Sequence, residues 1–492
     1  MKKFNIQNER NLTMLMDFYE LTMSNGYLKS GHKDTIVCFD MFFRKSPDGG
    51  GFAIAAGLEQ LIEYIESIKF KKEDIEYLRN RNLFEDEFLD YLANFKFTGN
   101  ISAIPEGTPV FPNEPMVTVT AKAIEAQFIE TMLLLTINHQ SLIATKTNRI
   151  VRAAQGRTVF ELGARRAHGY DAAIYGARAA YIGGVDGTAT SISDTKFNIP
   201  AIGTMAHSWV QFFKNEYEAF KTYAETYPDN CILLVDTYDV LHSGIPNAIK
   251  VNKEILEPMG KKLKGIRIDS GDLAYLSNKT RKMLDEAGLQ ECQIVVSNSL
   301  DEYTIEALLN QDAKIDIFGV GERLVTAKSE PVFGGVYKLV AVEENGEMVP
   351  RIKVSENIEK ITNPGCKDTW RLYDRETNMA IADVITLNNE TIDETKPYTI
   401  FDQVHIWKSK KVENFYAKKL QVPVYIDGQL VYECPSLKEI REYCIEQVNT
   451  LWGEIKRFYN PHKYYVDLSK DLWFLKNSML EWVRSGKYCR LF

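Results

Sequence analysis

The sequence lacks the patterns that mark metal-knuckle, disulfide-rich, secreted and membrane-spanning proteins. None of its seven cysteines has a partner at zinc-knuckle spacing, and their odd number in a chain of 492 residues argues against a disulfide framework. No apolar run approaches the roughly 20 residues that cross a membrane, and no apolar segment follows Lys2 and Lys3 as it would in a secretory signal. We therefore expect a cytoplasmic protein with reduced thiols and no membrane partner.

A surplus of basic residues is also missing. The chain has 59 Lys and Arg residues against 67 Asp and Glu residues, which gives a net charge of −8. Because a nucleic-acid-binding face has to be basic, we expect no nucleic-acid partner, although a few clustered arginines suffice to bind a small anion. Hydrophobic residues make up 45% of the chain, which is ordinary for a globular protein with a large core.

Two common phosphate-binding loops are absent as well. The segment Asp48–Gly51 is rich in glycine, but no Gly-Lys-Ser or Gly-Lys-Thr follows it, so it is a turn rather than a P-loop. No Gly-x-Gly-x-x-Gly follows the strand-like run that begins at Thr158, which argues against a dinucleotide-binding sheet. Any phosphate site in this chain must therefore be built from other side chains.

The pattern of expected elements divides the chain into three regions. Residues 1–138 combine amphipathic helices with strand-like runs such as Thr35–Arg44 and predict a β-rich α+β domain. In residues 139–342 short apolar runs alternate with helical stretches, which predicts an α/β catalytic domain. Residues 343–492 contain a hairpin signal and a capping box, and predict a β-rich and helical C-terminal region.

Six short apolar runs in the middle region are predicted to be strands. They are Thr158–Leu162, Ala201–Met205, Cys231–Val235, Lys264–Ile268, Gln293–Ser297 and Ile315–Val320. Strands that alternate with helices predict a parallel sheet. Repetition of this unit favours a closed or nearly closed α/β barrel, and a doubly wound open sheet is the alternative.

Polar residues, and in one case a glycine, follow most of these runs at the point where each run ends. They are Arg165, Arg166, His207, Asp236, Asp269 and Gly321, together with Asp186 after the apolar turn at residues 181–185. Because the carboxyl ends of parallel strands meet on one rim, we expect these residues to share one site. Paired arginines suit bidentate phosphate binding, and a surface ion pair is the alternative. The sequence therefore indicates a site for a phosphate-rich substrate.

His207 is the predicted centre of the chemistry. A histidine that shares a rim with carboxylates can be oriented and made basic by one of them, and Asp236 is the candidate partner. This arrangement would make His207 a nucleophile or a general base, whereas the alternative is a histidine that only fills a hydrogen-bonding position. Asp269 and Asp272 could bind sugar hydroxyls or Mg²⁺, or be exposed carboxylates of a turn.

Several motifs of the chain resemble those of the nicotinate phosphoribosyltransferase family. They are DFYELTM (Asp17–Met23), FELGARRA (Phe160–Ala167), GTMAHS (Gly203–Ser208), VDTYD (Val235–Asp239), IRIDSGDL (Ile266–Leu273), VVSNSLDE (Val295–Glu302) and FGGVYKLV (Phe333–Val340). The resemblance covers nearly the whole chain, and GTMAHS with IRIDSGDL is its most specific pair. It implies the type II phosphoribosyltransferase fold, which is an irregular α/β barrel with a β-rich N-terminal domain and a C-terminal appendage.

The resemblance also implies an activity. Nicotinate and phosphoribosyl pyrophosphate would be converted into nicotinate mononucleotide and pyrophosphate, the first step of NAD salvage from nicotinate. ATP would be hydrolysed through a phosphohistidine at His207, and Mg²⁺ would assist. Thr204 and Arg267 match substrate contacts of the family motifs, and we expect Arg267 to bind the carboxylate of nicotinate.

Two further residues are interpreted through the resemblance. The spacing around Tyr19 is typical of a core residue of a helix, but its match to the family motif implies that it reaches the pyridine ring in the neighbouring subunit of a head-to-tail homodimer. Glu322 stands where some family members carry threonine. Because a carboxylate repels phosphate, we expect the side chain of Glu322 to point away from the substrate.

Two alternative functions stay open at this point. One is the amide-specific nicotinamide phosphoribosyltransferase, which has the same fold. The other is a non-catalytic protein that binds nucleotide through an inherited barrel. The combined presence of Thr204, His207, Asp236, Arg267 and Asp269 argues against the non-catalytic protein.

Overall fold

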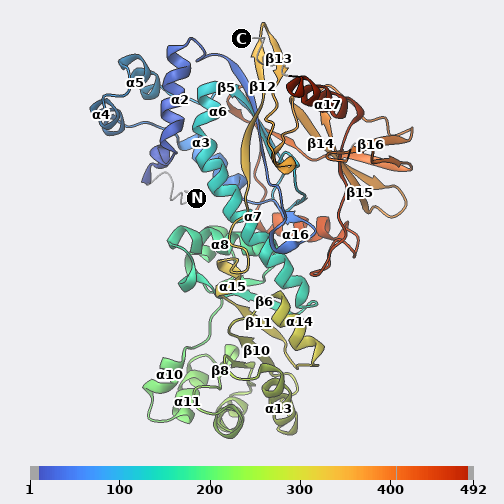
Figure 1. Cartoon of the computed structure of the whole chain (residues 1–492). Coiled ribbons are helices and arrows are strands. Elements are labelled where there is room, and N and C mark those ends of the chain that lie inside the picture. The colour runs from blue at the N-terminus through green and yellow to red at the C-terminus, as the bar shows by residue number, and fades with distance from the viewer. Residues whose placement is uncertain (1–9, 406, 486–492) are drawn as a thin grey trace. The chain divides into compact units, whose positions relative to one another are not determined.

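The structure is a computed structural model that describes residues 10–405 and 407–485, and only the backbone of Ile358 (Figure 1). The chain forms two compact units, which are Ile143–Pro331, here called the barrel unit, and Met1–Leu142 with Val332–Phe492, here called the two-segment unit. None of the helices in the described part has both the length and the apolar character of a membrane span. The three-region division expected from the sequence stays a prediction.

The described strands of the barrel unit form one parallel sheet. Their order across the sheet is β7 (Gly187–Thr188), β6 (Thr158–Glu161), β11 (Ile317–Val320), β10 (Gln293–Ser297), β9 (Gly265–Ile268) and β8 (Ile232–Leu234). Ile294, Val295 and Val296 of β10 are all buried, as expected for a parallel sheet that is covered on both faces. This burial explains why its strands are continuous apolar runs rather than alternating ones.

The predicted α/β fold is confirmed, and its parallel sheet is a curled half-barrel. In the described part no hydrogen-bonded pairing joins β7 to β8, so the sheet does not close into a complete barrel. One predicted strand is wrong, because the run Ala201–Met205 makes only a single bridge, from Ala201 to Thr188. The exposed Ala201 and Gly203 show that this run is not a buried strand. The two-residue strand β7 is too short for an apolar pattern to reveal.

Helices connect the strands of the barrel unit. They are α8 (Tyr170–Gly183), α9 (Ser191–Phe197), α10 (His207–Phe212), α11 (Glu216–Thr226), α12 (Ile245–Val251), α13 (Leu273–Glu286), α14 (Glu302–Asn310) and α15 (Glu322–Val325), with the shorter turns η3 (Ala164–Arg166), η4 (Pro228–Asn230), η5 (Val240–Gly244), η6 (Asn252–Leu256) and η7 (Glu257–Met259). Asp272 and Asp301 cap α13 and α14 by accepting backbone N–H groups. The carboxylate of Asp272 is therefore engaged in a local structural role.

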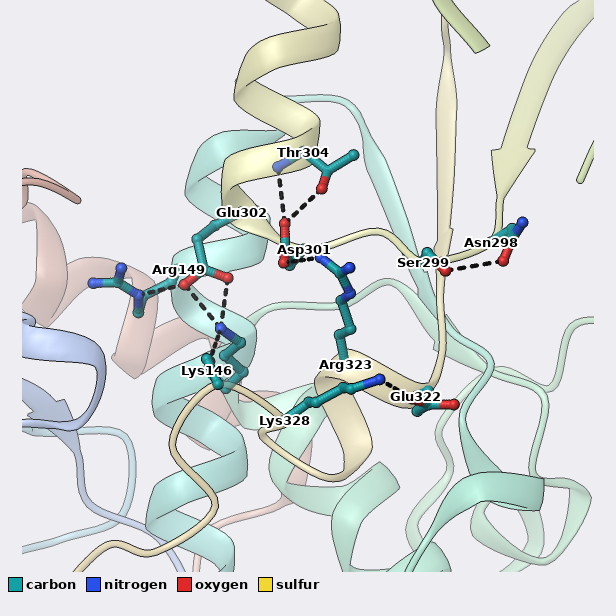
Figure 2. A network of polar contacts seen from close by, with 11 residues as sticks. Lys146, Arg149, Asn298, Ser299, Asp301, Glu302, Thr304, Glu322, Arg323 and Lys328 are labelled. Atoms are coloured by element: carbon teal, nitrogen blue, oxygen red, sulfur yellow. Dashed lines mark hydrogen bonds and ion pairs between the residues drawn. The ribbon is translucent and has the colours of Figure 1, made fainter. Parts of the chain in front are cut away.

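A buried ion cluster holds α14 to α7 (Glu130–Ala153), a helix that begins in the two-segment unit and ends in the barrel unit. In the barrel unit, Glu302 accepts from Lys146 Nζ at 2.9 Å and from Arg149 Nε at 2.8 Å (Figure 2). All three side chains are at most 3% exposed. Two cations facing one carboxylate offset the cost of burying it.

The two-segment unit contains three antiparallel or mixed sheets in its described part. The first has the order β13 (Glu347–Pro350), β12 (Val336–Glu344), β1 (Ile36–Phe42), β5 (Val117–Lys122), β3 (Asn100–Ala103), β19 (Val422–Ile426) and β20 (Gln429–Leu430). The second has the order β17 (Ser409–Val412), β16 (Tyr398–Asp402), β21 (Val466–Leu468), β15 (Ala380–Leu387), β14 (Lys367–Asp374) and β18 (Phe415–Lys419). The third pairs β2 (Ala53–Ile54) with β4 (Pro109–Val110).

The helices of this unit come from both ends of the chain. They are η1 (Leu12–Met14), α2 (Phe18–Lys29), η2 (Pro47–Gly49), α3 (Leu58–Ser67), α4 (Lys72–Asn80), α5 (Asp86–Ala93), α6 (Ala123–Phe128), η8 (Ile358–Lys360), α16 (Leu437–Asn449) and α17 (Lys470–Arg484). The capping box predicted at the start of α16 is confirmed, because Ser436 and Glu439 exchange hydrogen bonds. In the first sheet, β1 pairs with β12 and β3 pairs with β19. Strands from the N-terminal and the C-terminal segments therefore pair within one sheet.

A buried arginine joins the two segments of this unit. Arg371 on β14 makes two hydrogen bonds to Asp383 on β15, at 2.8 and 2.6 Å, and a third to the carbonyl of Pro109 at 2.8 Å. Its guanidinium lies over the rings of Phe111 and Tyr464, which are themselves stacked. Both charged side chains are fully buried. The site thus connects residues around 110 with residues around 371, 383 and 464.

We predict that Arg371→Met lowers the free energy of unfolding of the two-segment unit by roughly 3–5 kcal/mol, because Asp383 is left as an uncompensated buried charge. Arg375→Met is the matched control, since Arg375 pairs with Glu394 while both side chains are partly exposed. An exposed pair contributes about 1 kcal/mol or less. Urea unfolding of the two variants measures the difference, and equal losses would contradict the prediction.

Candidate active site

The carboxyl ends of three adjacent strands bring several predicted residues together. Asp236 follows β8, Asp269 follows β9, and Ser297 is the last residue of β10. Since these strands are neighbours in the parallel sheet, their carboxyl ends lie along one edge. Polar side chains that are far apart in the sequence therefore meet there, as the sequence predicted.

Arg267 is the most connected side chain of this edge. Its Nε donates to Ser297 Oγ at 2.9 Å, its Nη2 donates to Asp269 Oδ1 at 2.9 Å, and its Nη1 lies 3.4 Å from Thr204 Oγ1. Ser297 Oγ donates in turn to Asp269 Oδ1. The guanidinium is about one-fifth exposed. Arg267, Asp269, Ser297 and Thr204 therefore form one hydrogen-bonded cluster, here called the arginine cluster.

His207, the first residue of α10, lies beside this cluster. Its Nδ1 is 3.1 Å from Thr237 Oγ1, and its Nε2 is 3.9 Å from Asp269 Oδ2. The second distance exceeds that of a hydrogen bond but leaves the carboxylate close enough to act on the ring. The imidazole is 41% exposed. A reactant from solution can therefore reach a ring that is held at one nitrogen and faces an anion at the other.

The expected contact between Asp236 and His207 is wrong. Asp236 Oδ2 instead accepts from the backbone N–H of Asp269 at 3.0 Å and from Ser270 Oγ at 2.6 Å. Its Oδ1 is buried and has no hydrogen-bond partner among the described residues. Neighbouring residues direct their side chains to different sides of the chain, so it is Thr237 that reaches the imidazole. Asp236 holds the loop that carries Asp269.

The two predicted arginines lie after β6, in η3, and both are exposed. Arg166 Nε is 3.7 Å from Glu322 Oε2. Glu322 also pairs with Lys328 at 2.7 Å (Figure 2). In the described part, no hydrogen bond or ion pair connects Arg165 or Arg166 to His207. The arginines thus form a second, separate group on the same side of the sheet.

Glu322 is held by cations, and the expectation that it points away from a bound phosphate stays a prediction. Its hydrogen bond to Lys328 lowers the pKa of its carboxyl group, and Arg166 adds to the effect. The neighbouring Arg323 pairs with Asp301 (Figure 2). The carboxylate therefore neutralises part of the positive charge around the arginines.

Gly321 allows two strand ends to approach closely. A side chain at this position would lie 3.2 Å from the carbonyl oxygen of Leu162, and one at Gly163 would lie 2.8 Å from the carbonyl oxygen of Gly321. Such distances are tighter than ordinary packing permits. Glycine at both positions therefore brings the end of β11 next to the end of β6.

Asp186 does not join this edge. It precedes β7, so it lies at the amino end of that strand, and its Oδ2 accepts from the backbone N–H of Val159 at 3.1 Å. The predicted site residues lie at the carboxyl ends, so the geometry gives no support to a substrate contact by Asp186. The apolar turn before Asp186 resembled the end of a strand, but the strand begins only after it.

Several polar residues of this edge were not predicted. Thr237 lies inside the quoted motif VDTYD, and Ser297 ends the run QIVVS, so both were within recognised motifs but had no assigned role. Glu161, the last residue of β6, is buried and accepts from Thr188 Oγ1 at 2.6 Å and from the N–H of Gly163. Burial raises the pKa of the Glu161 carboxyl group. Its position at the strand end is the signal that could have identified it.

Comparisons with known proteins decide the family. Models for the nicotinate phosphoribosyltransferase (NAPRTase) N-terminal domain, family and C-terminal domain match residues 14–138, 158–371 and 366–476. The nicotinate phosphoribosyltransferase of Bacillus subtilis (strain 168) is 45% identical over 474 residues, which cover 96% of each chain. The chain belongs to the nicotinate phosphoribosyltransferase family. The resemblance stated from the sequence motifs is thereby confirmed.

Solved structures agree with this family assignment. The crystal structure of human nicotinic acid phosphoribosyltransferase matches with a TM-score of 0.84 at 28% identity, over 95% of this chain and all of that chain. The nicotinate-nucleotide pyrophosphorylase of Pyrococcus furiosus matches with a TM-score of 0.68 at 24% identity, over 92% of this chain and 99% of that chain. The second likeness shows a shared fold.

Tyr19 belongs to the two-segment unit, on α2. It is 42% exposed, and partial burial together with the carboxylate of Glu130 raises the pKa of its phenol group. The adjacent Glu20 is fully buried and accepts from Thr131 Oγ1. Burial raises the pKa of the Glu20 carboxyl group to about 7. The role expected for Tyr19 in a neighbouring subunit stays a prediction.

We predict a pH-dependent stability that originates at Glu20. Because its pKa is raised in the folded state from about 4.5 to about 7, its stabilising contribution is complete below pH 4.5 and is lost as pH rises through 7. Glu20→Gln should therefore become more stable relative to the original chain between pH 5 and pH 7.5, by up to about 3 kcal/mol. Chemical unfolding at both pH values measures this change.

Glu87→Gln is the control for this measurement, because Glu87 is an exposed carboxylate on α5 of the same unit. It should shift the free energy of unfolding equally at both pH values. A Glu20→Gln variant that behaves like this control would contradict the assignment.

Proposed function

We propose that the chain converts nicotinate and phosphoribosyl pyrophosphate into nicotinate mononucleotide and pyrophosphate, and couples this reaction to ATP hydrolysis through a phosphohistidine at His207. The observation that carries the proposal is the exposed imidazole of His207 between Thr237 and Asp269, beside the arginine cluster. The name of the Bacillus subtilis relative supports the choice of substrate. The expected location in the cytoplasm stays a prediction.

The first step would take place at the imidazole. A carboxylate on the Nε2 side favours the tautomer with its proton on that nitrogen, which leaves the lone pair on Nδ1. In the present geometry Thr237 can donate its hydroxyl proton to this lone pair. When Nδ1 instead attacks the γ-phosphorus of ATP, a nitrogen–phosphorus bond forms as the bond between the γ-phosphorus and the ADP oxygen breaks. Asp269 would stabilise the imidazolium that results.

The second step would transfer the ribosyl group. The pyridine nitrogen of nicotinate bonds to C1 of the ribose as the bond from C1 to pyrophosphate breaks. Positive charge that develops on the sugar is stabilised by a nearby carboxylate, and Asp269 is the candidate. Arg165 and Arg166 would bind the phosphate groups. Hydrolysis of the phosphohistidine would then release inorganic phosphate and restore the free imidazole of His207.

Arg267 would bind the carboxylate of nicotinate. A guanidinium carries five N–H donors, and the contacts to Ser297, Asp269 and Thr204 use three of them. Two donors, one on each terminal nitrogen, are left for a ligand. The ion pair with Asp269 fixes the position of Arg267 and neutralises part of its charge, so the two remaining donors would hold the carboxylate of nicotinate through hydrogen bonds.

The carboxylates of this edge also fit Mg²⁺. The buried Oδ1 of Asp236 has no hydrogen-bond partner among the described residues, and a hard oxygen atom of this kind is a suitable magnesium ligand. Asp236 and Asp269 would hold the ion together with substrate oxygens, since no group of three metal-binding side chains occurs in the described part. Bound there, Mg²⁺ would neutralise charge on the departing pyrophosphate.

We also propose a head-to-tail homodimer in which Tyr19 enters the neighbouring site. Its support comes from exposed apolar side chains on and next to α2. Leu15, Phe18, Tyr19 and Met23 are each about two-fifths exposed. Single exposed apolar residues are common, but a group of four on one short segment is typical of a surface that contacts another chain.

Phosphorylation of His207 is tested with ATP that carries a radiolabel on the γ-phosphate. We expect acid-labile label on the original chain and none on His207→Ala, because the imidazole of His207 lies beside the arginine cluster. His242→Ala is the matched control, since His242 lies in the same unit, is 84% exposed and also contacts a carboxylate, Asp239. This control should keep the label, and label on His207→Ala would end the phosphohistidine proposal.

Substrate choice is tested by competition between nicotinate and nicotinamide at equal concentration. We expect nicotinate mononucleotide as the main product, because only nicotinate has a carboxylate for Arg267. Arg267→Ala should reduce the preference for nicotinate at least tenfold, measured as the ratio of kcat/KM values. A main product made from nicotinamide would favour the amide-specific alternative, and absence of pyrophosphate release would favour a non-catalytic protein.

A further inference from the structure

Ser297 is a buried hydroxyl in the middle of the sheet that the proposed reaction does not yet use. It is 3% exposed and is the last residue of β10, between β9 and β11. On its β11 side it pairs with Gly319, which has no side chain. A serine hydroxyl at such a place must find hydrogen-bond partners within the protein.

The register of β9 and β10 provides these partners. Val295 on β10 pairs with Arg267 on β9. Since side chains alternate along a strand, Ser297 lies on the same face as Val295, and Asp269 follows Arg267 on that face. Three side chains from two neighbouring strands thus point to the same side of the sheet and meet at its carboxyl edge.

The contacts among these three side chains form a closed ring. Ser297 Oγ accepts from Arg267 Nε at 2.9 Å and donates to Asp269 Oδ1, and Asp269 Oδ1 accepts from Arg267 Nη2 at 2.9 Å. The hydroxyl is the one neutral member of the ring. It both accepts from the cation and donates to the anion, so it fixes the distance and the angle between them.

The ring determines which oxygen of Asp269 faces His207. Both hydrogen bonds end on Oδ1, and Oδ2 is the oxygen that lies 3.9 Å from His207 Nε2. The backbone of Asp269 is held independently by Asp236. Without the Ser297 hydroxyl, the Asp269 carboxylate would keep only the hydrogen bond from Arg267 Nη2, and Arg267 would lose the contact that orients its Nε.

We propose that Ser297 is a positioning residue that fixes the side chains of Arg267 and Asp269 relative to each other. Arg267 can then bind nicotinate while Asp269 faces the imidazole of His207. The inference rests on the proposed function. It assigns to Ser297 no contact with substrate, and it explains why a hydroxyl rather than an apolar side chain ends the buried strand β10.

Ser297→Ala tests this inference in the full chain. We expect kcat/KM for nicotinate to fall at least tenfold, which equals about 1.4 kcal/mol of transition-state stabilisation. The fall should combine a lower kcat with a higher KM for nicotinate, while the KM for ATP changes less than twofold. Ser297→Thr keeps the hydroxyl, so this variant should stay within threefold of the original chain.

Ser277→Ala is the matched control for the loss of a buried serine hydroxyl outside the candidate site. Ser277 lies on α13 of the same unit, is fully buried, and donates only to the carbonyl of Ala274 in its own helix at 3.1 Å. It should leave the kinetics of nicotinate unchanged.

If the original chain is active, three results would overturn the inference. They are a Ser297→Ala variant within twofold of the original kcat/KM, an equal loss in Ser277→Ala, and an equal loss in Ser297→Thr. An original chain that forms no nicotinate mononucleotide would instead refute the proposed function itself. The two failures are therefore distinguishable.

Discussion

The parallel hydrogen bonding between β9 and β10 is the constraint on which the candidate site depends. It pairs Val295 with Arg267 and thereby sets Arg267, Asp269 and Ser297 on one face of the sheet. A shift of β10 by one residue relative to β9 would turn the side chains of β10 to the opposite face of the sheet. The apolar residues Ile294 and Val296, which point the other way and are fully buried, oppose such a shift. The core therefore fixes the geometry of the polar edge.

Several charged groups of the described part are stabilised by ion pairs. Buried carboxylates such as Asp383 and Glu302 face arginine or lysine at hydrogen-bonding distance. Toward solvent, Glu322 is shared between Lys328 and Arg166. His207 differs from these groups, because its Nε2 faces a carboxylate across a gap and its Nδ1 meets a neutral hydroxyl. A ring with such partners can take up and release a charged group without disrupting an ion pair of the fold.

Much of the barrel unit could be predicted from the sequence because its strands are continuous apolar runs. Gln293–Ser297 is a strand with the predicted bounds, and four other runs contain strands slightly shorter than predicted. The failure at Ala201–Met205 has a physical cause. Its residues are apolar or small, but two of them are exposed, and composition does not reveal exposure. Likewise, the carboxyl edge could be predicted as a group, because the ends of parallel strands must meet.

Individual contacts within that group could not be predicted. Asp236 and Thr237 are adjacent in the chain, and only the backbone direction after β8 decides which of them reaches His207. The role of Ser297 depends on its register with Arg267, which a single sequence does not contain. For Asp186 the sequence showed an apolar turn, while the structure places the residue before a strand rather than after one.

The interleaving of β1 with β12 has a consequence for biosynthesis. About 300 residues separate Ile36 from Val336, so β1 leaves the ribosome long before β12 exists. At about 5–20 residues per second this delay lasts roughly 15–60 s. The barrel unit, by contrast, is encoded without interruption and is complete by Pro331. During translation the edge of β1 that later pairs with β12 therefore stays unpaired while the barrel unit is synthesised. An exposed strand edge can pair with other chains, so the nascent chain itself or a chaperone has to cover it.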